Sequence, residues 1–334
     1  MITFALPTEL SAGEPPEARG LTRDGVRLLV AEATAIWHAR FRDLGRFLDP
    51  GDLVVVNTSA TLPAAVDAGD VTVHFSTPLD DGRWVVELRR PDQSGPVRDA
   101  GAGDRIGLPE AAVLTLESAV SDRLWTARLS VDVPPYLHRV GRPITYGYLR
   151  GRWPLSAYQT VFAREPGSAE MPSAGRPFTA DLVTALVTAG VAVAPITLHT
   201  GVSSLESGEP PQPERFRVPA STARLVNLVR AHGGRVIAVG TTVARALESV
   251  AAPDGRVHAA AGWTDLVLGP DRPARTVDGL ITGLHDPRAS HLLLLEAIAG
   301  PALVQRAYDA AVSGRYLWHE FGDSCLLLPD GSSP

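Results

Sequence analysis

The chain has 334 residues, 45% of them hydrophobic and 20% charged, which predicts a folded protein with two domains or one large domain carrying an insertion. Its net charge of −6 at pH 7 excludes a basic coat over the whole surface, although a local basic patch remains compatible with it. The single cysteine, Cys325, excludes an internal disulfide and a cysteine metal cluster and suits a reducing compartment.

The N-terminal part of the chain predicts the start of an α/β domain. Residues 1–10 lack a basic leader region, and no run in the chain approaches about 18 uncharged apolar residues, so we expect a soluble cytoplasmic protein without a membrane partner. We predict strands at 26–30 and 34–38, a short amphipathic segment at 41–48, and a buried strand at 52–57 that leads into a loop at 58–63.

The pattern changes at about residue 69. Short strands are predicted at 71–75, 84–88, 105–108, 112–117 and 124–129, with turn clusters between them. Strands at this spacing are typical of a small antiparallel β-barrel or sandwich. We therefore predict a β-barrel domain and return linker over 69–151, inserted into a large α/β domain formed by 1–68 and 152–334.

The stretch 167–204 is the first place to expect a ligand site. A turn-rich loop at 167–178 precedes a helix capped by Thr179 and closed by Gly190, and a buried strand at 191–198 leads to His199. Loops that follow such strands hold ligands in many α/β proteins. The long polar segment 201–213 that comes next predicts a lid or another functional loop.

The C-terminal part repeats the strand and helix alternation. We predict helices at 221–232, after 242, from 290 and after 301, and strands at 235–239, 262–268, 277–282 and 324–328. Gly240, Thr241 and Thr242 join a buried strand to a helix, which leaves backbone N–H groups for a carboxylate or phosphate. The alternative is that one of the threonines only caps the helix.

Two histidines and two glutamates are the candidate polar site residues. His199 and His285 each follow a strand-like run, where an imidazole can act as general acid or base, although either can be a structural histidine. Glu170 and Glu214 lie in turn-rich segments and fit either a ligand hydroxyl or ammonium group, or plain solvation. No spacing typical of a metal site occurs, so we expect no metal.

Arginines alternate with aromatic residues in the segment that follows the predicted barrel. This pattern suits contact with RNA bases and phosphates, and it suits an interface between domains equally well. The residues concerned are Tyr136, Arg139, Arg142, Tyr146, Tyr148, Arg150, Arg152 and Trp153.

Ordered motifs along nearly the whole chain resemble one family, the S-adenosylmethionine:tRNA ribosyltransferase-isomerases of the queuosine pathway. The motifs are FRDLGRFLDPGDLVVVN, PPYLHR, AYQTVFA, GSAEMPSAGRPFT, ITLHTG, GGRVIAVGTTVARALES, GWTDL, VDGLITGLHDPRAS and RYLWHEFGDS. The resemblance implies a large α/β domain of pseudo-barrel type with an inserted small antiparallel β-barrel. It also implies transfer and isomerisation of the ribosyl part of S-adenosylmethionine, the donor substrate, onto a deazaguanine-type base in tRNA.

The resemblance further implies roles for residues of this chain. A base removes a proton next to the sulfonium, adenine leaves and an acceptor nitrogen attacks, with His199 and His285 as the proton-transfer residues. The expected S-adenosylmethionine contacts are Pro172, Ser173, Ala174, Gly175, Phe178, Thr179, Thr200, Gly201, Glu214, Gly240, Thr241, Thr242, Arg245 and Thr282. The expected RNA or acceptor contacts are Asn57, Tyr136, Arg139, Arg150 and Arg152.

The chain departs from the family pattern at several positions, and we hypothesise that these departures alter the acceptor side while the S-adenosylmethionine pocket is kept. The family's Asn-Asp-Thr-Arg/Lys is Asn57-Thr58-Ser59-Ala60 here, a loop histidine is Pro177, and a second histidine is Gln212. Two alternatives therefore stand beside the family reaction: an enzyme acting on a small nucleobase or nucleoside, and a non-catalytic RNA- or ligand-binding relative. We expect a monomer or a weak homo-oligomer.

Overall fold

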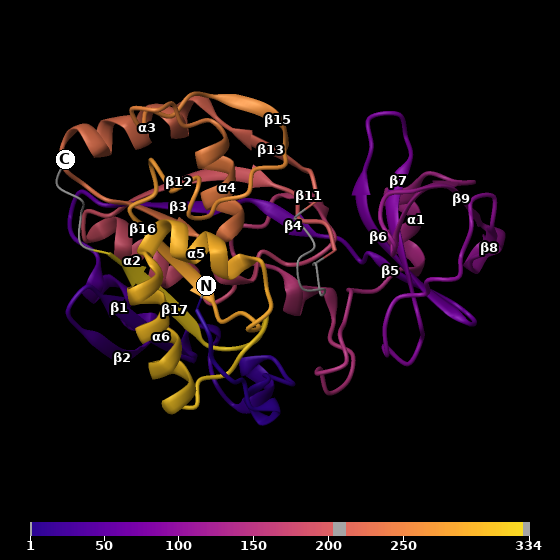
Figure 1. Cartoon of the computed structure of the whole chain (residues 1–334), viewed down its shortest axis with the longest axis horizontal. Helices are drawn as coiled ribbons and strands as arrows, with labels where there is room; N and C mark the ends of the chain where they lie inside the picture. Colours follow the sequence, from indigo (N-terminus) through magenta and orange to yellow (C-terminus); the bar gives the residue numbers. More distant parts are fainter. Residues whose placement is uncertain (1, 203–211, 330–334) are drawn as a thin grey trace.

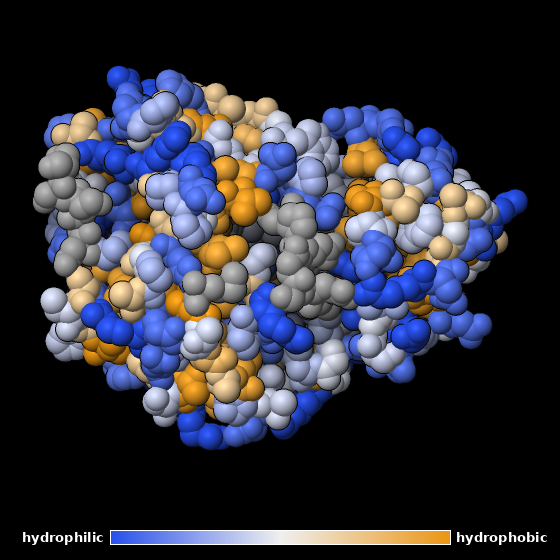
Figure 2. Space-filling view, viewed as in Figure 1, coloured by the Kyte–Doolittle hydropathy of each residue, from blue (hydrophilic) through white to orange (hydrophobic). Residues whose placement is uncertain are grey.

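A computed structural model describes residues 2–202 and 212–329 of the chain. The described chain forms a large body around a nine-stranded mixed sheet and a smaller lobe around a six-stranded antiparallel, barrel-like sheet (Figure 1). A space-filling view shows a constriction between the two and mainly hydrophilic residues at the outer end of the lobe (Figure 2). The prediction of an α/β fold with an inserted antiparallel barrel is confirmed.

The large sheet has the order β15-β13-β12-β3-β14-β16-β17-β1-β2. Its strands are β1 (Arg27–Glu32), β2 (Ile36–Arg40), β3 (Leu53–Asn57), β12 (Ala192–Leu198), β13 (Glu214–Val218), β14 (Val236–Val239), β15 (Ala260–Thr264), β16 (Gly279–Gly283) and β17 (Ser324–Leu328). Neighbours among β12, β3, β14 and β16 are parallel, so their carboxyl ends meet at one edge. β17 pairs antiparallel with β16 and parallel with β1.

Helices cover both faces of this sheet, which explains why its central strands are mainly apolar. The helices of the chain are α1 (Val133–Val140), α2 (Ala180–Thr188), α3 (Ala220–Ala231), α4 (Thr241–Ser249), α5 (His291–Ala299) and α6 (Pro301–Ser313). Side chains alternate across a strand, so Leu53 and Val55 of β3 join the core under α3 to α6, whereas Val54 and Val56 pack with α2 and the 3-10 helix η4 (Phe41–Phe47).

The smaller sheet has its own hydrophobic core, to which α1 contributes. Its strands are β5 (Ala65–Ala68), β6 (Val71–Pro78), β7 (Trp84–Arg89), β8 (Arg105–Gly107), β9 (Val113–Ala119) and β10 (Leu124–Leu129), in the order β5-β6-β7-β10-β9-β8. The predicted domain limits at 69 and 151 remain predictions.

Most predicted strands and helices are present within a few residues, and the differences lie mainly in short strands. β5 and β13 were not predicted, and the predicted loop 58–63 contains β4 (Ser59–Thr61), which pairs in parallel with β11 (Glu165–Ser168). The Thr179 side chain accepts a hydrogen bond from the N–H of Leu182, which confirms the predicted helix cap. Most of the predicted lid, residues 203–211, lies outside the described residues.

One buried amide links the carboxyl ends of β3 and β12 to α4. Asn57 is 4% exposed, and its Oδ1 accepts hydrogen bonds from the N–H groups of Ser59 and Leu198, each at 3.0 Å. Its Nδ2 donates to the Leu198 carbonyl at 2.8 Å and to Thr242 Oγ1 at 3.3 Å. The side chain placed among the RNA contacts by resemblance therefore makes structural hydrogen bonds inside the sheet.

Replacing Asn57 with alanine should therefore cost stability. We expect Asn57→Ala to lower the free energy of unfolding by about 2–5 kcal/mol, because buried backbone groups of two strands lose their partners. Urea denaturation measures the change. Gln305→Ala is the matched control, since that amide also bonds both backbone groups of Thr3, but at an exposed site where water replaces it. Equal losses in the two variants would contradict the assignment.

Candidate active site

A cavity of about 580 Å³ lies at the carboxyl edge of the parallel strands. Segments that follow β12, β14 and β16 line it, and so does the segment that precedes β17, because that strand runs antiparallel to β16. Tyr146 and Tyr148 also line it. They belong to the return segment, residues 130–158, which leads from the barrel back to the large sheet. The large sheet and the return segment therefore both contribute walls to the cavity. Its volume lies in the range of ligand pockets.

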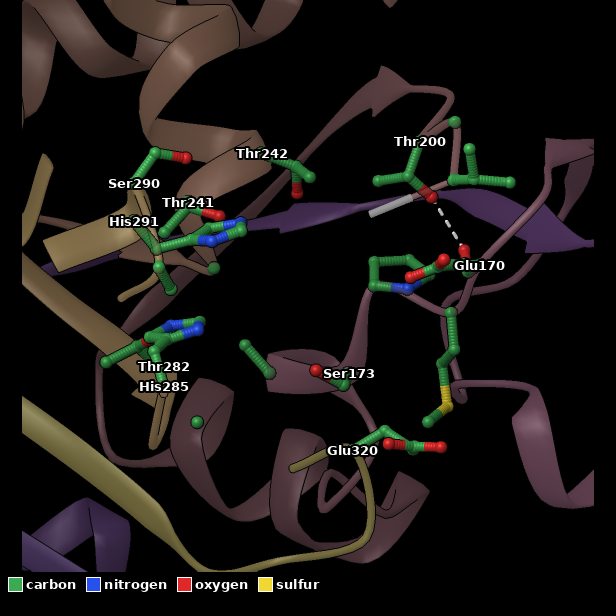
Figure 3. A pocket seen from close by; sticks show the side chains of 18 of the residues that line it. Glu170, Ser173, Thr200, Thr241, Thr242, Thr282, His285, Ser290, His291 and Glu320 are labelled. Carbon is green, nitrogen blue, oxygen red and sulfur yellow. Dashed lines mark hydrogen bonds between the residues drawn. The ribbon is translucent and has the colours of Figure 1, made fainter. Parts of the chain in front are cut away.

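The N-terminus of α4 opens into this cavity (Figure 3). Gly240 precedes the helix with φ 90° and ψ 157°, a conformation that favours glycine, and a Cβ there would lie 3.3 Å from the Cβ of Ala174. Thr241 and Thr242 are the first helical residues, and no side chain caps the helix. The alternative that a threonine caps α4 is therefore wrong, and the first N–H groups can receive an anionic group.

Two buried histidines form a second wall. The rings of His285 and His291 are parallel within 1° with their centroids 4.7 Å apart, and His285 Nε2 hydrogen-bonds Thr282 Oγ1 at 2.9 Å. Burial lowers the pKa of His291 to about 4 and holds the pKa of His285 well below its ordinary value, where the neighbouring His291 acts in the same direction. Both rings are therefore neutral at pH 7, and His285 can accept a proton.

A buried ion pair closes the side of the cavity nearest β13. The Arg245 guanidinium contacts the Glu214 carboxylate and donates to the carbonyl of Leu266 at 3.0 Å, and the N–H of Gly201 donates to Glu214 Oε1 at 3.2 Å. Burial raises the pKa of Glu214, and Arg245 opposes that rise. Glu214 is therefore not a solvated loop charge. Its side chain fixes the position of Arg245 beside the ligand space.

Tyrosines and carboxylates form a third wall. The Tyr146 hydroxyl donates to Glu170, and the Tyr148 hydroxyl donates to Glu320. Tyr148 also stacks on His319 with ring centroids 4.1 Å apart. Burial raises the pKa of Glu320 to about 7, so this carboxyl group exchanges a proton near neutral pH.

The structure brings together most of the side chains that the sequence singled out. The predicted residues that line the cavity are Pro172, Ser173, Ala174, Thr200, Gly201, Glu214, Gly240, Thr241, Thr242, Arg245, Thr282 and His285. Gly175, Phe178, Thr179 and His199 do not appear among the lining residues. Phe178 is 1% exposed and packs edge-on against Phe41 at 5.0 Å in the hydrophobic core, because the turn after Gly175 carries it under the sheet.

His199 lies behind the cavity lining. Its Nδ1 hydrogen-bonds Ser59 Oγ at 2.7 Å, and Ser59 Oγ also contacts Ser168 Oγ at 2.6 Å. The ring packs so closely on Gly167 that a Cβ there would lie 2.5 Å from Nδ1. Burial lowers the pKa of His199. The proposed proton-transfer role of His199 remains a prediction.

The predicted RNA contacts in and after α1 lie away from the cavity lining. Tyr136 is buried in the barrel core and donates to the Pro109 carbonyl at 2.9 Å, and Arg139 pairs with Glu110 at 2.9 Å. Arg152 pairs with Asp67 at 3.1 Å. Arg150 packs against Gly13. Their contact with RNA remains a prediction, whereas Tyr146 and Tyr148 of the same segment line the cavity.

Sequence reasoning did not select His291 or Glu320. His291 is the first residue of α5, a position that gives a histidine no distinctive pattern. Glu320 lies in the RYLWHEFGDS motif, which contributed to the family resemblance without a role for this residue. Its partner Tyr148 is 172 positions away, so the pairing has no local signal.

The described ranges 2–202 and 212–329 contain no group of three or more His, Cys, Asp or Glu side chains arranged to hold a metal ion. None of the described helices combines the length and the apolar composition that crossing a membrane requires.

A cavity with several convergent polar groups at the carboxyl edge of an α/β sheet, with one wall from the segment that returns from an inserted barrel, is typical of an α/β enzyme that encloses a sizeable ligand between two parts of its chain. Comparison with known proteins narrows this class. A family model described as queuosine biosynthesis protein matches residues 1–327, and the chain belongs to that family. The resemblance found in the sequence is confirmed.

Individual relatives agree with this placement. A protein of Symbiobacterium thermophilum named S-adenosylmethionine:tRNA ribosyltransferase-isomerase is 35% identical over 350 residues, which cover 97% of this chain and 98% of that protein. A Rubrobacter xylanophilus protein of the same name is 36% identical, with 99% and 98% covered. The crystal structure of S-adenosylmethionine tRNA ribosyltransferase from Thermotoga maritima matches with a TM-score of 0.55 and 29% identity, covering 97% and 99% of the two chains.

The buried histidine pair should make stability depend on pH. Because the folded-state pKa of His291 lies below the unfolded value of about 6.5, the unfolded chain binds the extra proton as the pH falls. The unfolding free energy of the wild type should therefore fall between pH 7 and pH 5. In His291→Leu we expect this loss to be smaller by about 2 kcal/mol. Urea denaturation at both pH values measures it. His258→Leu, at an exposed histidine, should leave the loss unchanged, and an unchanged loss in His291→Leu as well would contradict this account.

Proposed function

We propose that this protein transfers and isomerises the ribosyl part of S-adenosylmethionine onto a deazaguanine-type base in tRNA. The observation that carries the proposal is the cavity itself, which combines an open helix N-terminus with a buried neutral histidine in a chain of the queuosine biosynthesis protein family. The names of the relatives above state the donor, the tRNA, ribosyl transfer and isomerisation. S-adenosylmethionine is then a substrate rather than a resident cofactor, and tRNA is the acceptor.

The N-terminus of α4 binds the methionine carboxylate. The free N–H groups after Gly240 and the partial positive charge of the helix end suit a carboxylate. Arg245, whose charge Glu214 balances, lies on the same side of the cavity. Pro172 to Ala174 form the adjoining wall, close to the helix start, where the adenosine part fits. This arrangement orients the donor before any bond changes.

His285 takes the proton next to the sulfonium. Its ring is neutral at pH 7, and its hydrogen bond to Thr282 together with the His291 stack fixes the ring plane. Removal of that proton allows adenine to leave. The acceptor nitrogen then forms the new bond to the ribosyl carbon, and methionine leaves with the electron pair of the carbon–sulfur bond. Acid–base help from one positioned group contributes about 10²–10⁴ in rate.

Substitution of Gly240 should weaken donor binding. Gly240→Ala strains the backbone at φ 90° and adds a methyl group close to Ala174, so we expect the dissociation constant for S-adenosylmethionine to rise about tenfold or more. Isothermal titration calorimetry measures it. Gly103→Ala is the matched control: its φ is 92°, but nothing in the barrel lies within 4 Å of the added Cβ. Unchanged affinity in Gly240→Ala would argue against the carboxylate site.

Substitution of the two histidines should separate their roles. We expect His285→Ala to lower kcat by about 10²–10⁴ with S-adenosylmethionine affinity largely preserved, because a proton acceptor is lost rather than a binding contact. His199→Ala should lower kcat less, because that ring lies behind Ser59. Mass spectrometry of the modified tRNA measures turnover, and near-normal turnover of His285→Ala would refute its role.

Product analysis with and without tRNA tests the reaction as a whole. The proposal requires adenine release that depends on tRNA carrying the aminomethyl-deazaguanine base. Adenine release without tRNA would favour a small-molecule acceptor. Binding without any release would favour a non-catalytic protein.

A further inference from the structure

The wall formed by Tyr148, Tyr158 and Glu320 has no role in the steps above. Tyr158 belongs to the 3-10 helix η6 (Leu155–Tyr158), is 3% exposed and lines the cavity. Its hydroxyl is buried and has no hydrogen-bond partner among residues 2–202 and 212–329. A buried hydroxyl without a partner is costly, and its place in a cavity wall points to a ligand atom as the partner.

This wall lies on the other side of the cavity from the proposed proton-transfer residue. In Figure 3, Glu170 and Glu320 lie opposite His285 and His291, with Ser173 between the two sides. The donor carboxylate belongs beside the His285 side, at Thr241. The wall with Glu320 therefore faces the space that remains for the acceptor.

We propose that Glu320 is the catalytic residue that accepts a proton from the acceptor's primary ammonium group, and that the Tyr158 hydroxyl is a further contact to the acceptor. The inference rests on the proposed function and names the group that prepares the attacking nitrogen. The aminomethyl group of the acceptor base is an ammonium in water and has no lone pair for attack until it loses a proton.

The step balances as a proton transfer followed by a displacement. One N–H bond of the ammonium breaks, and its proton moves to a carboxylate oxygen of Glu320, which becomes a neutral carboxyl group. The electron pair left on nitrogen forms the bond to the ribosyl carbon, while the carbon–sulfur bond of the sulfonium breaks and methionine leaves with the electron pair of that bond as a neutral thioether. The charge of the ammonium and the charge of the carboxylate cancel, so the cavity gains no net charge.

Glu320 suits this task better than Glu214, a second carboxylate of the cavity. Glu214 is held by Arg245, and a full positive charge beside a carboxylate weakens it as a base. Glu320 instead receives a hydrogen bond from the neutral Tyr148 hydroxyl, and burial brings its pKa to about 7. A group with a pKa near the working pH transfers protons most effectively in both directions.

Titratable groups from five parts of the chain line the same hollows as Glu320. They are Tyr148 and Tyr158 of the return segment, Glu170 after β11, Arg176 after η7 (Ser173–Gly175) and, in the segment before β17, His319, with Arg23 across a small hollow. Tyr148 lowers the pKa of Glu320 through its hydrogen bond, whereas the Glu170 charge raises it.

The test compares Glu320→Gln with the wild-type protein, using S-adenosylmethionine and tRNA that carries the aminomethyl base. Glutamine keeps an oxygen for Tyr148 but accepts no proton. We expect kcat at pH 7 to fall about 100-fold or more and the affinity for S-adenosylmethionine to stay unchanged. The wild-type rate should level off above about pH 7, whereas the variant rate should rise about tenfold per pH unit up to pH 9, because solvent must then remove the proton. Glu117→Gln, an exposed carboxylate of the barrel, is the matched control.

A second variant leaves the carboxylate in place. Tyr158→Phe removes only the unpartnered hydroxyl, so the protein should fold at least as well as the wild type. We expect its KM for the tRNA to rise about tenfold with unchanged affinity for S-adenosylmethionine. Tyr316→Phe removes a hydroxyl that bonds His38 and lies outside the cavity lining, and it should leave KM unchanged.

The outcomes separate this inference from the proposed function. Near-normal kcat of Glu320→Gln, a variant pH profile like that of the wild type, or a tenfold loss of S-adenosylmethionine affinity would each overturn the role of Glu320. An unchanged KM of Tyr158→Phe would overturn the acceptor contact. A wild-type protein that binds S-adenosylmethionine but modifies no tRNA would overturn the proposed function and this inference with it.

Discussion

The side chain of Asn57 is the constraint on which the cavity depends. Its amide joins the end of β3 to the end of β12, to the start of β4 and to the first turn of α4. The cavity lies next to these ends. A few short, buried hydrogen bonds therefore set the distances between the elements around it. A buried amide with all its partners in place defines one geometry, because every displaced partner leaves an unsatisfied polar group.

The titratable groups of the cavity fall into two kinds, those with a charged partner and those with neutral partners only. Arg245 and Glu214 compensate each other, which keeps a charge in place inside the protein without making it reactive. Glu320 and His285 have only neutral partners, a tyrosine for one and a threonine for the other, so burial shifts their pKa values without fixing their charge. The groups without charged partners are the ones that can exchange protons during a reaction.

The sequence was sufficient for the parts of the fold that depend on local patterns. Apolar runs predicted β3, β12, β14 and β16, and Gly240 between a strand and a helix predicted the helix start in the cavity. Short strands such as β13 were not predicted, because ERFRV is brief and follows a polar segment that indicates a loop. Glu320 and Tyr158 were not predicted for another reason. Their proposed roles depend on contacts with residues far away in the sequence, and no local pattern predicts such contacts.

The strand order has a consequence for how the chain folds during synthesis. β17 lies between β16 and β1, so the early hairpin of β1 and β2 has no place in the large sheet until the last strand has been made. Domains generally fold as the ribosome delivers them, and here the barrel can do so while the large sheet waits. Glu320 lies shortly before β17, which begins at Ser324, so the same late segment completes both the sheet and the cavity wall. The cavity wall that contains Glu320 therefore forms only after β17 has been synthesised and has paired with β16 and β1.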